Sequence, residues 1–385
     1  MTSPQPDLPD RLRQRRRLER RRLERRRRFR RRRITAAVIV LLPTGLLVVL
    51  LLSGTHQGHG PSSDNRALTR PRSDPSVLPG DVLIADRGNN RLLELDPSGH
   101  VVWQFPRPGD LRPGQTFKSP DDAFFDPSGQ FVVATQEDDF VISVIDVRRH
   151  RIVYRYGRPG VPGATSNRLN NPDDAIPMAG GTILSADIKN CRLIILRPPS
   201  HAPVRQLGST GLCLHDPPLS FASPNGAFPT SGGATVVTEI SGNWIDLLAP
   251  SGKLIGATHP PGFSYPSDTN EVKPGLFLSA DYIHPGAIEM FDLHGRLRWR
   301  YAPKGRHALD KPSLAVPLPN GDVLANDDDN NRVIVVNPRT KQIVWQYGHT
   351  GRPGRGPGYL NDPDGLDLAP PYSLLRQFPS ARAPG

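Results

Sequence analysis

The sequence has little cysteine and, outside its first 33 residues, no net charge. Only two of its 385 residues are Cys, and the formal net charge is +12. Residues 1–33 hold sixteen Arg against four acidic residues, whereas the remaining 352 residues carry 33 basic and 33 acidic groups. The basic surplus therefore belongs to one short segment, and the body of the protein has no general attraction for nucleic acid. We expect no nucleic-acid partner.

The composition also argues against an all-helical fold, and several catalytic motifs are absent from the sequence. The 43 Pro and 36 Gly make about a fifth of the chain turn-forming, which argues against a helical protein. The sequence contains no His-x-His or His-Glu-x-x-His spacing, no Gly-x-Ser-x-Gly elbow and no phosphate loop. Zinc, serine-nucleophile and nucleotide chemistry thus have no motif to support them.

An uncharged apolar run follows the Arg-rich segment. Residues 34–52 carry no charge, and as a helix they would span roughly 28 Å, enough to cross a bilayer. The Arg block upstream places the amino terminus in the cytoplasm by the positive-inside rule. We therefore expect a single-pass cell-membrane protein with a transmembrane helix at residues 34–53 and an extracytoplasmic remainder. A cleaved signal peptide is the alternative, but its apolar segment is usually shorter and ends at an Ala-x-Ala-like site.

The segments on either side of this run have simpler interpretations. The Arg-rich residues 1–33 act as an orientation signal, with sensing of anionic lipid as the alternative. Residues 54–77 are rich in Ser, Pro, Gly and His and have no apolar period, which predicts a flexible stalk. Arg outnumbers Lys 42 to 7, a composition typical of a GC-rich bacterial source.

The rest of the chain is a repeat. Units of 42 to 52 residues each contain four short apolar runs separated by Gly, Pro and Asn turns. Each unit begins with a proline: Pro120, Pro172, Pro224, Pro266, Pro312 and Pro363. Repeated four-stranded units of this length are the signature of a β-propeller, an all-β fold. We therefore expect a propeller over residues 78–370, followed by a tail at residues 371–385.

The two ends of the repeat complement one another. The first unit, which starts near Leu78, lacks the proline-led strand that opens the others. Residues 361–370 supply such a strand with nothing after it. Joining the two gives a sixth blade, closes the ring and removes both free sheet edges. The sequence thus predicts six blades, with the carboxyl-terminal strand closing the first.

Two stretches resemble a known repeat family. Residues 85–99, ADRGNNRLLELDPSG, and residues 347–366, YGHTGRPGRGPGYLNDPDGL, are similar to the NHL repeat, with its Ala-Asp-x-Gly-Asn-Asn-Arg turn and Asn-x-Pro-x-Gly start. The propellers loosely labelled pyrroloquinoline-quinone-like are similar as well. The resemblance implies the propeller fold but not one function, because propellers include binding modules, lyases and hydrolases.

One turn motif recurs between the second and third strands of a blade. Its Asp, Asn and Arg occur as Asp86-Asn89-Arg91, Asp187-Asn190-Arg192 and Asp327-Asn330-Arg332. The spacing suits an Asp that accepts backbone N–H bonds and an Arg that pairs with a carboxylate. A structural staple is the favoured interpretation, and ligand binding on the loop face is the alternative.

Acidic residues open most of the first strands, which line the central channel of a propeller. Side chains alternate along a strand, so we expect one residue of each leading pair to face the channel. Four blades can each contribute a carboxylate, and such converging charges favour a divalent cation such as Ca²⁺. The candidate metal ligands are Asp122, Asp174, Asp268 and Asp364, and Asn225 joins them as a candidate ligand-binding residue. Aspartates that merely cap turns and bind channel water are the simpler alternative.

Histidine, tryptophan and cysteine have structural interpretations in this scheme. His215, His259, His284, His307 and His349 fall in loops expected on the channel-mouth face, but none occupies a repeated inner-strand position. The zinc-binding histidines of NHL-type amidating lyases therefore have no matching set here. Trp103, Trp299 and Trp345 share one repeated position, which favours packing between blades. Cys191 and Cys213 lie in loops expected on one face, where a disulfide can form outside the cytoplasm.

These observations favour a membrane-anchored extracytoplasmic propeller that acts as a binding or scaffolding module. Its partner would be a protein or small molecule bound on a propeller face. The alternative is a metal-assisted lyase or hydrolase that uses the channel-mouth carboxylates as ligands or bases. A quinone-dependent dehydrogenase is a third class, supported only by the repeat.

Overall fold

The computed structural model describes residues 73–373. The Arg-rich segment, the expected membrane helix at residues 34–53 and most of the expected stalk lie outside this part. Within it, no helix is long and apolar enough to cross a membrane. The described part includes the end of the expected stalk, where a short 3₁₀ helix, η1 (Pro75–Val77), follows Asp74. The amide of Asp74 donates to the carbonyl of Val344 at 3.0 Å, so these residues already contact the propeller.

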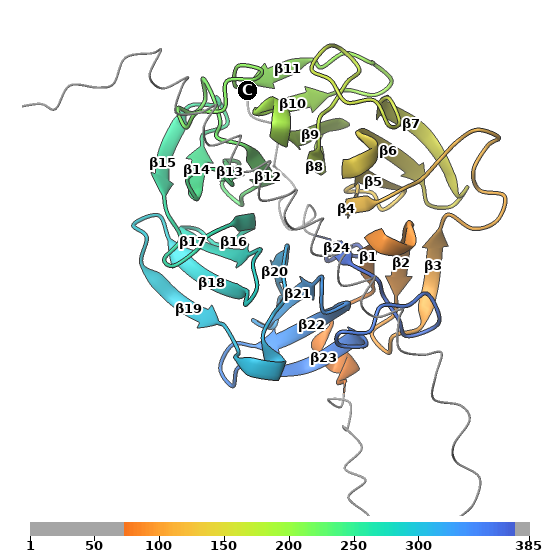
Figure 1. Ribbon diagram of the computed structural model, residues 1–385, viewed down its shortest axis with the longest axis vertical. Coiled ribbons are helices and arrows are strands. Elements are labelled where there is room, and N and C mark those ends of the chain that lie inside the picture. The colour runs from red at the N-terminus through yellow and green to blue at the C-terminus, as the bar shows by residue number, and fades with distance from the viewer. Residues whose placement is uncertain (1–72, 374–385) are drawn as a thin grey trace, which may run out of the picture. The chain divides into compact units, whose positions relative to one another are not determined.

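Within residues 73–373, twenty-four strands form six four-stranded antiparallel sheets arranged in a ring (Figure 1). The region enclosed by their first strands is called the channel. We number the blades from the one that contains β1. Blade one consists of β24 (Pro363–Leu368), β1 (Val82–Asp86), β2 (Arg91–Leu95) and β3 (Val101–Phe105). Blade two consists of β4 (Pro120–Phe125), β5 (Phe131–Gln136), β6 (Val141–Asp146) and β7 (Arg151–Gly157). Blade three consists of β8 (Pro172–Met178), β9 (Thr182–Asp187), β10 (Arg192–Leu196) and β11 (Arg205–Leu207).

The other three blades follow the same order from the channel outward. Blade four consists of β12 (Pro224–Pro229), β13 (Thr235–Glu239), β14 (Trp244–Leu248) and β15 (Leu254–Thr258). Blade five consists of β16 (Pro266–Lys273), β17 (Leu276–Asp281), β18 (Ala287–Asp292) and β19 (Leu297–Tyr301). Blade six consists of β20 (Ala315–Pro317), β21 (Val323–Asp327), β22 (Arg332–Asn337) and β23 (Gln342–Gly348). Pro312, the proline expected to lead blade six, lies just before β20.

The carboxyl-terminal strand closes the ring as the repeat predicted. β24 pairs antiparallel with β1, with Val82 opposite Leu368 and Ile84 opposite Leu366. Asp367 of the same strand accepts a 3.0 Å hydrogen bond from the amide of Phe125 in blade two. The last strand therefore completes the first sheet and also contacts the next blade.

Burial along the strands explains their composition. The second strands are almost wholly buried because blades pack on both of their faces, and they read as apolar runs such as Val82–Asp86. The outermost strands have one face on solvent, so exposed and buried residues alternate in β7. The all-β six-bladed fold expected from the sequence is thus confirmed.

The Asp-Asn-Arg turns of blades one, three and six join each of these blades to the connector that precedes it. In blade one, Arg91 Nε donates to Asp86 Oδ2 at 2.6 Å, and its other nitrogens reach the carbonyl oxygens of Arg355 and Tyr359. Arg192 and Arg332 make the same bond to Asp187 and Asp327 in blades three and six. The turns include the 3₁₀ helices η2 (Arg87–Asn89) and η4 (Ile188–Asn190), and blade two has η3 (Glu137–Asp139) at the same place. η5 (Gly305–His307) lies in the connector before blade six. The motif acts as the expected staple.

Aromatic residues of the outer strands bind the next blade. Trp103 Nε1 donates to the carbonyl of Val147, Trp299 Nε1 to that of Pro338, and Trp345 Nε1 to that of Pro97. In each case the acceptor lies in the turn between the third and fourth strands of the following blade. The repeated aromatic position therefore serves packing between blades.

We predict that Trp345→Phe lowers the free energy of unfolding by about 1–3 kcal/mol, because it removes a hydrogen bond and leaves a small cavity. Trp345 is 1% exposed and its indole bond to Pro97 is 2.9 Å long. Trp299→Phe is the matched control, since it removes an equivalent bond at a less buried position. Chemical denaturation of the purified full chain measures both. Equal effects from the two variants would show that burial of Trp345 contributes nothing beyond the hydrogen bond.

Candidate functional site

The candidate site lies at the mouth of the channel, where the inner strands begin. The register between the first and second strands shifts just after the leading proline in blades one to five. A bulge of this kind breaks the strict alternation of side chains. Consequently Asp173 and Asp174 both join the same cluster of carboxylates. The expectation that one residue of each pair faces the channel was therefore wrong for this strand.

An outer layer of polar side chains surrounds the mouth. Arg87 pairs with Asp121, with Asp364 at 2.7 Å and with Glu137 at 2.7 Å, so it joins blade one to blade two. Across the mouth, the amide nitrogen of Asn225 donates to Asp173 at 2.8 Å and to Ser267 at 3.2 Å. These bonds link neighbouring inner strands around the ring.

Beneath this layer, four carboxylates converge. Asp122, Asp173, Asp174 and Asp268 each offer an oxygen, and these four atoms lie within 4.8 Å of one another. All four residues are buried, with Asp174 0% and Asp268 2% exposed. The Oδ1 atoms of Asp122, Asp174 and Asp268 have no hydrogen-bond partner among the described residues. Buried oxygens without donors are uncommon in folded proteins, and several that converge form a donor set that suits a hard cation.

Two glycines leave the room that these oxygens occupy. A Cβ atom on Gly226 would lie 2.5 Å from Asp268 Oδ1 and 3.0 Å from Asp174 Oδ2. A Cβ atom on Gly365 would lie 2.3 Å from Asp122 Oδ1. Both glycines occupy the second position after the leading proline, where blades two, three and five carry Asp. Side chains at these two positions would collide with the carboxylate cluster.

Burial and mutual repulsion disfavour the charged form of the cluster. Burial raises the pKa of Asp122 well above its ordinary value, and the nearby charges of Asp268 and Asp173 raise it further. The pKa values of Asp174 and Asp268 are raised for the same two reasons. Burial alone would lower the pKa of Arg87, but Asp121, Asp364 and Glu137 outweigh that effect and raise it. Arg87 therefore stays charged, whereas the cluster needs protons or a cation.

The structure separates one expected ligand from the others. Asp122, Asp174 and Asp268 come together, but Asp364 binds Arg87 and is not in the group of four. Asp173 takes the fourth place. Asn225 lies beside the cluster as a donor to Asp173. The sequence contained no signal for the role of Arg87, because it lies in a turn whose other residues form the blade-one staple.

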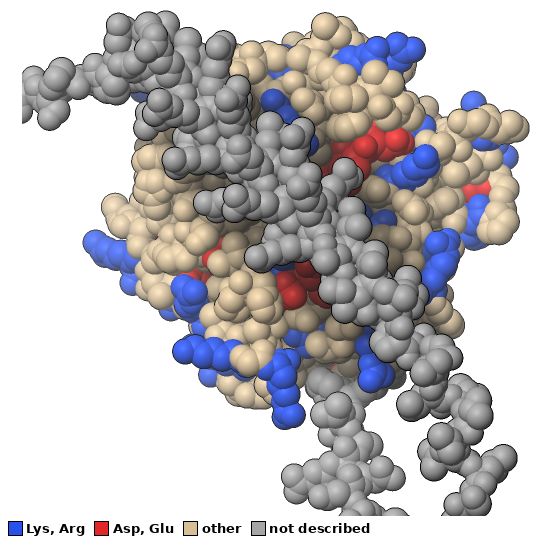
Figure 2. All heavy atoms as spheres, in the orientation of Figure 1, with Lys and Arg blue, Asp and Glu red and all other residues tan. Residues whose placement is uncertain are grey.

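A second hollow lies at the other ends of the inner strands. A cavity of about 800 Å³ between blades two and three is lined largely by apolar residues, among them Phe131, Val144, Tyr154, Met178 and Ile183. Residues 126–128 and 178–182 border it, and they follow the ends of β4 and β8. The propeller thus has an acidic channel mouth and an apolar recess on opposite faces. On the face seen in Figure 2, basic side chains lie mainly around the periphery and acidic atoms lie nearer the middle.

Comparison with known proteins supports the fold and assigns no family. No family model matches the chain, and no curated protein does. Among solved structures, a protein of unknown function from Bacteroides caccae is 13% identical, with 75% of this chain and 98% of that chain covered and a TM-score of 0.53. A streptogramin B lyase is 16% identical over 77% of this chain and 88% of its own, with a TM-score of 0.50. A chain of a nidogen/laminin complex is 15% identical over 75% of this chain and 98% of its own, with a TM-score of 0.50. At these identities the likeness concerns the fold alone.

We predict that Asp268→Asn stabilises the metal-free protein at neutral pH. A carboxyl whose pKa is raised by folding contributes most to stability below its unfolded value of 3.8, and that contribution is lost as the pH rises through the folded value. The amide carries no charge and can donate to neighbouring carboxylates. The gain should be about 1 kcal/mol or more at pH 7.5, since one pKa unit corresponds to about 1.4 kcal/mol, and it should vanish near pH 4.

Thermal unfolding in EDTA across this pH range measures the difference between Asp268→Asn and the parent. Asp96→Asn is the opposite control, because hydrogen bonds from His100 lower the pKa of Asp96. That variant should lose stability at neutral pH rather than gain it. A metal-free Asp268→Asn protein that is less stable than the parent at pH 7.5 would contradict the electrostatic interpretation of the cluster.

Proposed function

We propose that this protein is a membrane-anchored, extracytoplasmic NHL-type propeller that acts as a binding module and holds one Ca²⁺ ion in its channel. The observation that carries the proposal is the group of four buried carboxylates, three of whose oxygens have no hydrogen-bond partner within residues 73–373. The NHL assignment rests on the turn and connector motifs of the sequence. The apolar recess between blades two and three supports a ligand or partner on the face opposite the ion.

The donor set favours Ca²⁺ over softer metals. All four groups offer oxygen, and no His or Cys belongs to this cluster. Ca²⁺ prefers six to eight oxygen ligands at about 2.3–2.6 Å, and it tolerates irregular geometry. Four carboxylates can supply that number with some bidentate binding or with water. Zn²⁺ would favour nitrogen or sulfur ligands in a regular tetrahedron.

The position of Arg87 supports a structural ion rather than a catalytic one. Arg87 and its partners Asp121 and Asp364 occupy the mouth above the carboxylates, and the four carboxylates are buried. A metal-assisted lyase or hydrolase needs an open coordination position that the substrate can reach. An ion covered in this way would join inner strands of blades two, three and five instead.

The membrane anchor is proposed from the sequence alone. The Arg-rich residues 1–33 and the apolar residues 34–52 together predict a span with its amino terminus inside. The disulfide between Cys191 and Cys213 supports the same placement, because disulfides persist mainly outside the cytoplasm.

We predict that Ca²⁺ raises the melting temperature of the EDTA-treated full chain, measured in detergent. At one hundred times its dissociation constant, a ligand adds about 2.7 kcal/mol, which corresponds to about 4 °C for roughly 300 ordered residues. Asp268→Asn should melt higher than the parent without Ca²⁺ and should respond little to it. This combination separates loss of an ion site from general damage.

Gly226→Ala provides an independent variant, because its methyl group would enter the space between Asp174 and Asp268. It should abolish the response to Ca²⁺. Gly232→Ala is the matched control, since a Cβ there meets nothing within 4 Å. If Ca²⁺ stabilises neither the parent nor the Gly232→Ala protein, the proposed ion site is wrong.

We predict that the full chain sediments with membranes and resists extraction by high salt and alkaline carbonate. Protease added outside intact cells or spheroplasts should degrade residues after 53 and leave the Arg-rich segment protected. Deletion of residues 34–52 should release the protein from the membrane fraction. Recovery of the intact parent in the soluble fraction would argue for a cleaved or unanchored chain.

A further inference from the structure

Blade four departs from the staple that blades one, three and six share. In those blades an Asp at the end of the second strand stands opposite an Arg at the start of the third, as Asp86 stands opposite Arg91. The corresponding pair in blade four is Glu239 and Trp244. An acidic residue is therefore kept at this position while the arginine that would neutralise it is replaced by an apolar ring.

A second buried acid lies beside the first. Asp246, two residues after Trp244 in β14, is 0% exposed, and among the described residues no N–H group donates to its carboxylate, which shares a hydrogen bond with Glu239. Glu239 is also 0% exposed, and one of its oxygens accepts from the amide of Ala222. Two carboxylates thus lie in the interior of blade four without a basic partner from the staple.

A histidine from the preceding connector completes the group. His215 Nδ1 lies 3.3 Å from Glu239 Oε1 and 3.8 Å from Asp246 Oδ2. Two ligands of a tetrahedral Zn²⁺ ion at about 2.0–2.1 Å from the metal are roughly 3.4 Å apart, so these separations already approach a coordination geometry. One donor atom from each of the three residues lies within 4.8 Å of the others.

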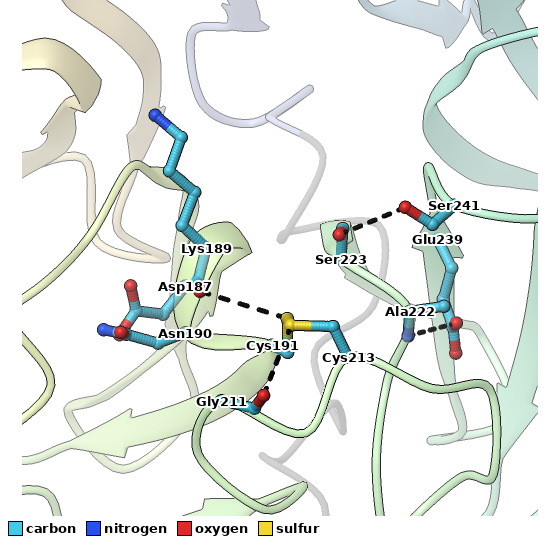
Figure 3. The surroundings of a disulfide bond; sticks show 10 residues. All are labelled: Asp187, Lys189, Asn190, Cys191, Gly211, Cys213, Ala222, Ser223, Glu239 and Ser241. Atoms are coloured by element: carbon cyan, nitrogen blue, oxygen red, sulfur yellow. Dashed lines mark hydrogen bonds between the residues drawn. A yellow bond between two sulfur atoms is a disulfide. The ribbon is translucent and has the colours of Figure 1, made fainter. Parts of the chain in front are cut away.

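Two contacts hold His215 in this position. Its ring stacks on that of Trp244, with centroids 3.9 Å apart and an angle of 1° between the planes. Two residues earlier, Cys213 is joined to Cys191 of blade three, with the two Cα atoms 5.1 Å apart. Figure 3 shows this disulfide next to the segments that carry Ala222 and Glu239. The connector is thus fastened to both blades near the histidine.

We propose that His215, Glu239 and Asp246 bind one divalent metal ion of the Zn²⁺ or Mn²⁺ class. One imidazole and two carboxylates form a mixed nitrogen and oxygen donor set, which suits these ions better than Ca²⁺. His215 has a side-chain exposure of 22%, whereas both acids are buried, so an ion enters from the histidine side and keeps its remaining position open toward solvent there.

This site is separate from the carboxylate cluster in the channel. It uses β13, β14 and the connector before β12, and it shares no residue with the group of Asp122, Asp173, Asp174 and Asp268. The two proposals therefore stand or fall independently.

The test is titration of the metal-free full chain with Zn²⁺ by calorimetry, in detergent and with Ca²⁺ present. His56 and His59 of the expected stalk are replaced by Gln in every sample, because they could bind Zn²⁺ on their own. We expect one Zn²⁺ per chain. His215→Gln and Asp246→Asn should each weaken binding at least tenfold while leaving the response of the melting temperature to Ca²⁺ intact.

His259→Gln is the matched control. His259 contacts the same Trp244 ring at 3.7 Å, but its Nδ1 lies 3.0 Å from the carbonyl oxygen of Asn243 and it is not in the donor group. This variant should bind Zn²⁺ as the parent does. The proposal is overturned if the parent binds no Zn²⁺, or if His215→Gln and Asp246→Asn bind it as tightly as His259→Gln does.

Discussion

Closure of the ring is the constraint on which the other features depend. Because β24 pairs with β1, all six sheets point their first strands at one channel, and all six leading segments meet at one mouth. Residues that occur once per repeat at equivalent positions are therefore arranged in a ring around the channel. Aspartates separated by about fifty residues along the chain, such as Asp122 and Asp174, become neighbours in this way. The same closure lets the outer-strand Trp345 of blade six bind a turn of blade one, so no blade lacks a partner on either side.

Convergence of acids would oppose folding if nothing offset it. In the outer layer, the charge of Arg87 offsets the repulsion by pairing with Asp121 and Asp364. The side-chain amide of Asn225 helps by donating a hydrogen bond to Asp173. Within the group of four, Asp173 accepts from Asn225 and Asp174 Oδ2 accepts from the amide of Ala227. Among the described residues, however, the Oδ1 atoms of Asp122, Asp174 and Asp268 have no hydrogen-bond partner, and glycines keep the space around them open. The four aspartates raise each other's pKa, and two glycines leave space around them. A bound ion explains this arrangement more readily than stability of the metal-free fold does.

The fold was largely predictable from the sequence because its signals are periodic. The leading prolines, the apolar strands and the incomplete first unit together predicted six blades and the closing strand. The channel site was predictable only in part. Sequence identified Asp122, Asp174 and Asp268, but strict alternation gave no place to Asp173, because the bulge after Pro172 is a local departure from regular strand geometry. Asp364 was expected among the ligands and instead binds Arg87, a pairing between residues 277 positions apart that no local pattern encodes.

The cluster in blade four was missed for a related reason. His215 does not recur at equivalent positions of other blades, so the repeat gives no signal for it. The informative signal is a repeat position at which the usual residue, here the Arg of the staple, has been replaced. Where three blades place Arg opposite an acid, blade four places Trp244, and it adds Asp246 to an acid that already lacks its counter-ion. Blades two and five also lack the Arg of the staple, since Gln136 faces Val141 and Asp281 faces Ala287, so the ring does not need the staple in every blade. Repetition thus accounts for the channel cluster, and the residues that replace the staple in blade four point to the second cluster.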